Sequence, residues 1–190
     1  LCMSAGEPLP AGAWNAWKDA TGCDIYDGYG QTETINIVAN FPGMEIRPGS
    51  MGKPCPGLTV DVIDDEGNIA DDDDVGHIGV KITDPYPPGL FRGYYRDKQE
   101  TAVSFRNGWY YTGDTATRDP DGYIWFVGRS DDIITSAGYR ISPFEVESAL
   151  IEHAAVAESA VVAKPDDLRG EIVVAFITLA AGYAPSDDLA

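Results

Sequence analysis

Histidine and cysteine are scarce in this sequence. Its only histidines are His77 and His153, which argues against a histidine-based metal cluster and against a Ser-His-Asp triad. The three cysteines, Cys2, Cys23 and Cys55, are odd in number, lie far apart and form no C-x-x-C pair. This pattern is typical of reduced cytosolic thiols and argues against a disulfide framework or a zinc site, so we expect a cytoplasmic protein.

Basic residues are also few. The sequence contains 13 Lys and Arg and 31 Asp and Glu, which gives a formal net charge of −18. Such a field repels nucleic acid and anionic membrane surfaces, so neither is expected as a partner. Part of the acidic excess lies in "DDDD" at 71–74, which predicts a solvated loop. An acidic surface adapted to high salt is the alternative interpretation of the composition.

Long apolar runs are absent. No stretch approaches the roughly 20 apolar residues that a membrane helix needs, and no basic-then-apolar leader opens the chain. The first residues, "LCMSAGEP", lack an initiator Met, and we interpret the chain as a fragment of a longer protein. Its 190 residues, 44% of them hydrophobic, are enough to form a core in one domain or two small ones.

Strand and helix patterns divide the chain into three parts, and the predicted fold class is mixed α+β. Residues 1–49 contain a helix predicted over 10–22 and then a brief strand, "CDIY", and are interpreted as the end of an α/β subdomain. Residues 50–130 alternate strands with turns and include a hairpin with an Asp-Pro-Asp-Gly hinge, which predicts an antiparallel β-barrel-like subdomain. Residues 131–190 are expected to begin a small, truncated α+β domain, and the family resemblance described below implies that this domain is mobile.

The strongest helix prediction covers residues 141–156. Ser142 can cap this helix, Pro143 suits its first turn, and Glu145 completes an S-x-x-E capping box. The predicted buried stripe consists of Val146, Ala149 and Leu150. Two apolar strands follow, "ESAVVAKPD" and "EIVVAFITLA".

Several polar or glycine-containing clusters follow one another along nearly the whole chain. They are "SAGEPL" (4–9), "YDGYGQTE" (26–33), "GSMGKPCPG" (49–57), "LFRGYYRD" (90–97), "GWYYTGD" (108–114), "GYIWFVGRSDDIITSAGYRISPFEVE" (122–147) and "VAESAVV" (156–162). Taken together and in this order, they resemble the signatures of the adenylate-forming superfamily, which contains acyl-CoA synthetases, luciferases and nonribosomal-peptide adenylation domains. Within this superfamily, the residues of these motifs are most similar to those of short- and medium-chain acyl-CoA synthetases, enzymes of fatty acid metabolism.

The resemblance gives "YDGYGQT" a role in binding the nucleoside. It implies that Tyr29 lies flat on adenine, that Gly28 and Gly30 keep the backbone clear on either side, and that Asp27 accepts from the adenine amino group. Gln31 belongs to the same nucleotide-binding stretch. Without the neighbouring motifs, these residues would equally suit a plain glycine-rich turn.

The end of the same motif is implied to handle phosphate and metal. Thr32 would offer a hydroxyl to the phosphates of ATP, and Glu33 a hard oxygen ligand for their Mg²⁺. Both are expected to be catalytic. The alternative is that Thr32 is the N-cap of a following helix.

Other nucleotide-binding residues are implied by motifs far from "YDGYGQTE". Gly6, Glu7 and Pro8 would form the second wall of the adenine slot, although Gly-Glu-Pro also suits any loop before a helix. Asp114 would accept both ribose hydroxyls, and Arg129 would donate to the same ribose. As alternatives, Asp114 is a turn residue and Arg129 a surface side chain.

The last part of the chain is implied to serve a second step. Asp131 would be the hinge on which the small domain swings, unless it merely begins a turn. Gly138 would let the pantetheine of CoA pass, and Arg140 would meet phosphate oxygens. Gly30 lies where acetate-specific relatives carry a Trp, which predicts an acid pocket open to longer or bulkier acids.

Two features of the superfamily are not found within the 190 residues: the Ser/Thr/Gly/Lys phosphate loop upstream of "GEP" and a late lysine in "P-x-x-x-x-G-K". We therefore expect these residues alone to be nearly inert, with activity in the parent protein. The predicted parent uses ATP, Mg²⁺, CoA and a small carboxylic acid, with no indication of its oligomeric state. The alternatives are an enzyme that loads a carrier protein and a non-catalytic adenine-nucleotide-binding module.

Overall fold

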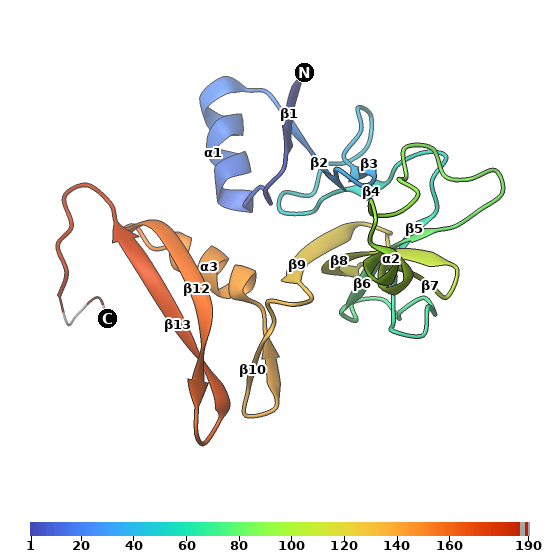
Figure 1. Ribbon diagram of the computed structural model, residues 1–190. Helices are drawn as coiled ribbons and strands as arrows, with labels where there is room; N and C mark the ends of the chain where they lie inside the picture. The colour runs from blue at the N-terminus through green and yellow to red at the C-terminus, as the bar shows by residue number, and fades with distance from the viewer. Residues whose placement is uncertain (187–188, 190) are drawn as a thin grey trace. The chain divides into compact units, whose positions relative to one another are not determined.

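The computed structural model describes residues 1–186 and 189, and these form two compact units, Leu1–Val127 and Gly128–Ala190 (Figure 1). The described chain is mixed α+β, as predicted, with three short helices and three sheets. The units meet between Val127 and Gly128. The division into three parts at residues 50 and 131 stays a prediction.

The first sheet carries the "YDGYGQTE" segment. Its strands lie in the order β1 (Cys2–Ala5), β2 (Ile25–Gln31), β3 (Ile35–Ala39) and β4 (Lys53–Pro54). Strand β1 is parallel to β2, and the other pairs are antiparallel. Helix α1 (Ala11–Thr21) connects β1 to β2 and ends at Gly22, whose φ of 71° is the left-handed conformation that glycine adopts readily. The helix predicted over 10–22 is thus confirmed.

The second sheet is antiparallel and curled. Its strands are β5 (Val60–Ile63), β6 (Gly76–Lys81), β8 (Trp109–Arg118) and β7 (Phe105–Arg106), with β9 (Ile124–Arg129) also paired to β8. Helix α2 (Lys98–Ser104) precedes β7. The turn at 119–122 joins β8 to β9, which confirms the hairpin predicted around Asp-Pro-Asp-Gly.

One hydrophobic core joins the two sheets of the first unit. Val38 of β3, Val62 of β5, Ile78 of β6 and Tyr110 of β8 belong to the same buried cluster, each exposing at most 1% of its surface. Burying such side chains is worth about 1.5–3 kcal/mol each, so this core fixes the first sheet against the second. The core therefore determines how residues on β2 meet residues on β8.

The second unit is a four-stranded sheet with one helix. Its strands are β10 (Ile134–Ser136), β11 (Tyr139–Ile141), β12 (Val156–Asp166) and β13 (Gly170–Leu179), in the order β11-β10-β13-β12. Figure 1 shows β12 and β13 as a long hairpin, with α3 (Pro143–Ile151) against β12. Ser142 accepts a hydrogen bond from the Glu145 N–H at 3.3 Å, so the predicted N-cap is confirmed.

Two details of this helix prediction are wrong. Helix α3 ends at Ile151, not at residue 156, because a turn closed by the Val156 N–H and the His153 carbonyl leads directly into β12. The predicted stripe is not buried either. Ala149 is exposed and Leu150 is only half-buried, since a nine-residue helix that packs chiefly on one strand covers a narrow face.

The alternative of a plain glycine-rich turn does not hold for most of "YDGYGQTE". Six of its residues, 26–31, belong to β2, and no helix follows Thr32. The glycines Gly28 and Gly30 are needed within the strand, because a Cβ at either position would come within 3.0 Å of the neighbouring strand β3.

Candidate functional site

The parallel pairing of β1 and β2 brings two predicted motifs together. Ser4 is paired with Asp27, and Ala5 with Gly28. The "GEP" segment leaves β1 immediately after Ala5, so it begins beside the middle of the "YDGYGQ" strand. Carboxyl ends of parallel strands commonly form the edge at which a nucleotide binds.

Tyr29 and Asp114 meet although 85 residues separate them in sequence. The Tyr29 hydroxyl donates to Asp114 Oδ2 at 2.5 Å, and the Gln31 side-chain amide donates to the same oxygen at 2.8 Å. Burial raises the pKa of Tyr29 far above its usual value, so this hydroxyl keeps its proton and acts as a donor. The predicted adenine plate and the predicted ribose carboxylate therefore belong to one hydrogen-bonded cluster.

Asp27 and Asn40 each bury an oxygen that has no hydrogen-bond partner. Asp27 Oδ1 and Asn40 Oδ1 are both inaccessible, and the two side chains line the same small pocket with Trp14. The backbones of Asp27 and Asn40 are joined by a 2.8 Å hydrogen bond. Burial raises the pKa of Asp27 from 3.8 to about 6, although N–H groups of Gly28 and Leu9 partly oppose the shift.

The raised pKa of Asp27 predicts a pH-dependent stability. The folded protein holds this proton up to about pH 6, whereas the unfolded chain loses it near 3.8. The stabilising contribution is therefore complete below pH 3.8 and is lost as pH rises through about 6, a change on the order of 3 kcal/mol. We expect Asp27→Asn to remove this part of the pH dependence and to raise the free energy of unfolding at pH 7.5 relative to wild type.

Urea denaturation at pH 4.5 and pH 7.5 measures this effect as a difference between variant and wild type. Asp19→Asn is the control, because Asp19 is exposed on α1. Equal pH dependence in Asp27→Asn and wild type would show that the buried carboxyl does not titrate as stated.

Glu33 and Thr32 lie in the turn between β2 and β3. The Glu33 carboxylate is half-buried and accepts one hydrogen bond, from the Tyr94 hydroxyl at 3.3 Å, while Thr32 is exposed. Among the residues that the structure describes, no group of three or more His, Cys, Asp or Glu side chains is arranged so that it could hold a metal ion. A Mg²⁺ ion that arrives on phosphates needs only one or two protein carboxylates, so Glu33 fits a metal brought by its substrate.

Gly30 packs against the backbone of the next strand. A Cβ at this position would lie 1.8 Å from the Ile35 carbonyl oxygen, and Ile35 itself has a φ of 59°. This close approach is a structural reason for glycine at position 30, independent of any acid pocket. The pocket role of Gly30 stays a prediction.

The remaining predicted residues lie in the second unit. Arg129 Nε donates to Asp131 Oδ1 at 3.1 Å, and this hydrogen bond is the main cause that lowers the pKa of Asp131. Gly138 has a φ of 87° in the turn between β10 and β11, and Arg140 is exposed on β11. The meeting of Arg129 with Asp114, which belongs to the other unit, stays a prediction.

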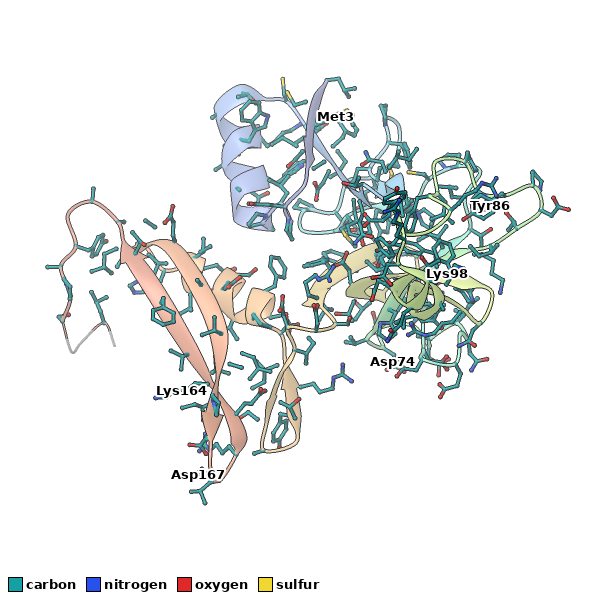
Figure 2. All side chains as sticks on the ribbon, viewed as in Figure 1. Met3, Asp74, Tyr86, Lys98, Lys164 and Asp167 are labelled. Carbon is teal, nitrogen blue, oxygen red and sulfur yellow. The ribbon has the colours of Figure 1, made fainter. Side chains whose placement is uncertain are left out.

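The solvated loop predicted at "DDDD" is confirmed. Residues 71–74 are exposed, on the loop where Figure 2 labels Asp74, and Arg118 pairs with Asp72 there. His153, one of the two histidines, is exposed after α3.

Four residues of the cluster were not predicted: Tyr94, Tyr110, Thr112 and Asn40. Tyr94 and Tyr110 lie inside motifs that the resemblance includes, "LFRGYYRD" and "GWYYTGD", and both carry hydroxyls. A tyrosine inside such a motif combines an aromatic ring with a hydroxyl, and this combination was the sequence signal that could have identified Tyr94 and Tyr110 as site residues.

With the fold and this cluster established, similarity to known proteins can be assigned. The model of the family described as "AMP-binding enzyme" matches residues 1–95, and that of the "AMP-binding enzyme C-terminal domain" matches residues 145–190. The chain belongs to the AMP-binding enzyme family, whose members form adenylates.

Several relatives are similar over almost the entire chain. Acyl-coenzyme A synthetase ACSM3, mitochondrial, from Rattus norvegicus is 53% identical over 98% of this chain and 32% of its own length. 4-Hydroxybutyrate–CoA ligase 1 from Metallosphaera sedula is 53% identical over 99% of this chain and 33% of its own. The crystal structure of the anthranilate CoA ligase AuaEII in complex with anthranoyl-AMP superposes with a TM-score of 0.87, at 42% identity, over 99% of this chain and 36% of that one.

The chain spans about a third of the length of the curated relatives that it matches. Among the described residues, no helix is long and apolar enough to cross a membrane.

Proposed function

We propose that the protein containing this chain is an AMP-forming acyl-CoA synthetase. A carboxylate oxygen of the acid attacks the α-phosphorus of ATP, the bond to the β-phosphate breaks, and acyl-AMP and pyrophosphate form. The CoA thiolate then attacks the acyl carbon and AMP leaves. The observation that carries the proposal is the hydrogen-bonded meeting of Tyr29 with Asp114, which connects the two parts of a nucleoside site.

The nucleoside is held by residues of the first unit. Tyr29 stacks on adenine between Gly28 and the "GEP" segment, residues 6–8. Asp27 accepts from the adenine amino group, a role that its place beside Gly28 and Tyr29 on β2 supports. Asp114 accepts from the ribose, because an ionised carboxylate can take two hydroxyl donors.

Phosphate and metal are handled by the turn after β2. Thr32 donates to phosphate oxygens, and Glu33 offers a carboxylate oxygen to the Mg²⁺ that ATP carries. Bound Mg²⁺ would neutralise part of the negative charge of the phosphates. The exposed hydroxyl of Thr32 and the single hydrogen bond of Glu33 support these roles.

The second unit, interpreted as the start of a mobile domain over 131–190, serves thioester formation. Asp131 is the proposed hinge, and its ion pair with Arg129 would break or move when the backbone turns. Arg129 donates to the ribose in one pose, and Gly138 and Arg140 face CoA or phosphate. A cytoplasmic location is proposed from the reduced cysteines, while the rat relative is named as mitochondrial.

The test uses the full-length protein and a panel of short, medium and aromatic acids. We expect ATP–pyrophosphate exchange only when an accepted acid is present, and AMP release only after CoA is added. If the protein catalyses acid-dependent exchange but adding CoA does not increase AMP release, an enzyme that loads a carrier protein would be favoured. Binding of AMP without any exchange would favour a non-catalytic module, and either result would overturn the proposal.

A further inference from the structure

A side chain of β2 holds the carboxylate that is proposed to bind ribose. Strands β2 and β8 belong to different sheets (Figure 1). Gln31, the last residue of β2, donates from its amide nitrogen to Asp114 Oδ2 of β8 at 2.8 Å. The Tyr29 hydroxyl donates to the same oxygen at 2.5 Å. One oxygen of Asp114 therefore receives two donors from β2.

The hydrogen bonds of the Gln31 amide define its orientation. Its nitrogen also donates to the Thr112 carbonyl at 3.0 Å, and its oxygen accepts from the Tyr110 hydroxyl at 3.1 Å. A flipped amide would turn its oxygen toward two acceptors, the Asp114 carboxylate and the Thr112 carbonyl. The amide nitrogen has two N–H groups, and each of these acceptors takes one of them.

Tyr110 holds the oxygen end of this amide. Its ring exposes only 1% of its surface and lies 5.3 Å from the ring of Phe91 and 5.0 Å from that of Phe105, measured between centroids. Burial raises the pKa of Tyr110, so its hydroxyl keeps the proton that it donates to Gln31. The amide is thus anchored to a side chain of the hydrophobic core.

Strand β8 is irregular at the position that carries Asp114. The register of its pairing with β6 shifts between residues 111 and 115. Gly113 lies within this bulge and has a φ of 81°, the left-handed conformation that glycine adopts readily. Bulges redirect the side chains beside them. The direction of the Asp114 carboxylate therefore depends on contacts outside the regular ladder of β8, and Gln31 supplies one of them.

We propose that Gln31 is a positioning residue that fixes the orientation of the Asp114 carboxylate and, through it, sets the preference of the site for nucleotides that carry both ribose hydroxyls. Gln31 acts through Asp114 and not through a contact of its own with the nucleotide. The inference rests on the proposed function, in which Asp114 accepts from the ribose.

The physical basis of the proposal is preorganisation. A carboxylate turns about the bond that joins it to its Cβ, and only some orientations present lone pairs to the ribose hydroxyls. Two donors on Oδ2 select one orientation before the nucleotide arrives, so binding does not have to order the group. Without Gln31, the Tyr29 hydroxyl alone would hold this oxygen.

Binding of AMP and of 2′,3′-dideoxyAMP to the full-length protein measures the preference. The two nucleotides differ only in the ribose hydroxyls, so the ratio of their dissociation constants reports the contribution of these groups. We expect wild type to bind AMP about 50-fold more tightly, because hydrogen bonds to a charged group are strong. In Gln31→Met the ratio should fall to about 5-fold through weaker binding of AMP, with the affinity for 2′,3′-dideoxyAMP changed less than about 2-fold.

Gln99→Met is the matched control, because Gln99 is exposed on α2 and undergoes the same chemical change. Its ratio should equal that of wild type. Tyr110→Phe is a second test if Gln31→Met does not fold. It removes the donor to the amide oxygen but keeps both bonds of the amide nitrogen, so its ratio should lie between those of wild type and Gln31→Met.

A double variant tests whether Gln31 acts through Asp114. Asp114→Ala alone should make the two affinities nearly equal, and adding Gln31→Met should then weaken AMP binding no further. Partial unfolding would weaken the binding of both nucleotides alike and leave their ratio unchanged.

The outcomes separate this inference from the proposed function. If wild type binds no AMP and catalyses no acid-dependent exchange, the proposed function fails. If wild type prefers AMP and Gln31→Met keeps the full preference, the inference is wrong while the function stands. Equal weakening of both nucleotides in Gln31→Met would also overturn the inference. So would a wild-type protein that exchanges but binds both nucleotides equally, because Asp114 would then not contact the ribose.

Discussion

Glu33→Ala in the full-length protein is expected to abolish acid-dependent ATP–pyrophosphate exchange, with a loss of at least about 100-fold. The substitution removes the carboxylate proposed to contact the Mg²⁺ of ATP and leaves the Tyr94 hydroxyl without its acceptor. The measurement is the exchange rate at saturating acid and ATP, with thermal unfolding recorded in parallel. Unfolding should change little, because the carboxylate makes one hydrogen bond.

Glu66→Ala is the matched control for this prediction. Glu66 is exposed in the turn after β5. Its substitution by alanine removes the same charge from the protein as Glu33→Ala does, but at a position outside the site. We expect its exchange rate to equal that of wild type. If Glu33→Ala exchanged at the wild-type rate, the proposed contact between Glu33 and Mg²⁺ would be wrong.

Gly30→Ala is expected to destabilise the first unit severely. The added methyl group would lie 1.8 Å from the Ile35 carbonyl oxygen and 2.8 Å from the Asn36 Cα, both of them backbone atoms. Relief requires β2 and β3 to separate, which breaks the pairing that holds Tyr29 and Gln31 in position. The cost is about 3 kcal/mol or more, the upper part of the range for overpacked sites.

The measurement is the midpoint of urea denaturation, with Gly12→Ala as the control. Gly12 lies in α1, and an added Cβ there meets nothing within 4 Å. Alanine should stabilise that helix by up to about 1 kcal/mol, because glycine has low helix propensity. Equal midpoints for Gly30→Ala and wild type would show that β2 and β3 can separate at no cost.

The parts of the fold that follow local rules could be predicted. Gly22 ends α1, Ser142 caps α3, and the turn at 119–122 joins β8 to β9, each from residues adjacent in sequence. The "YDGYGQ" strand could not be predicted from local rules, because its glycines favour a loop. The strand forms through its pairing with β1 and β3, and β1 is separated from it in the sequence by helix α1.

The site could be predicted in its residue types and only partly in its arrangement. Family resemblance named Tyr29 and Asp114, and the structure joins them at 2.5 Å. The link from Gln31 through Tyr110 required coordinates, because the two residues lie 79 positions apart in the sequence. Tyr94 was missed for the same reason, since its hydroxyl reaches Glu33 from 61 residues away.

The contact between Gly30 and the Ile35 carbonyl also limits which side chains position 30 can accept. A bulky side chain there would not be a single-residue exchange on this backbone. The hairpin from 29 to 36 would have to be rebuilt with it, so the side chain and the strand geometry at this position can only change together.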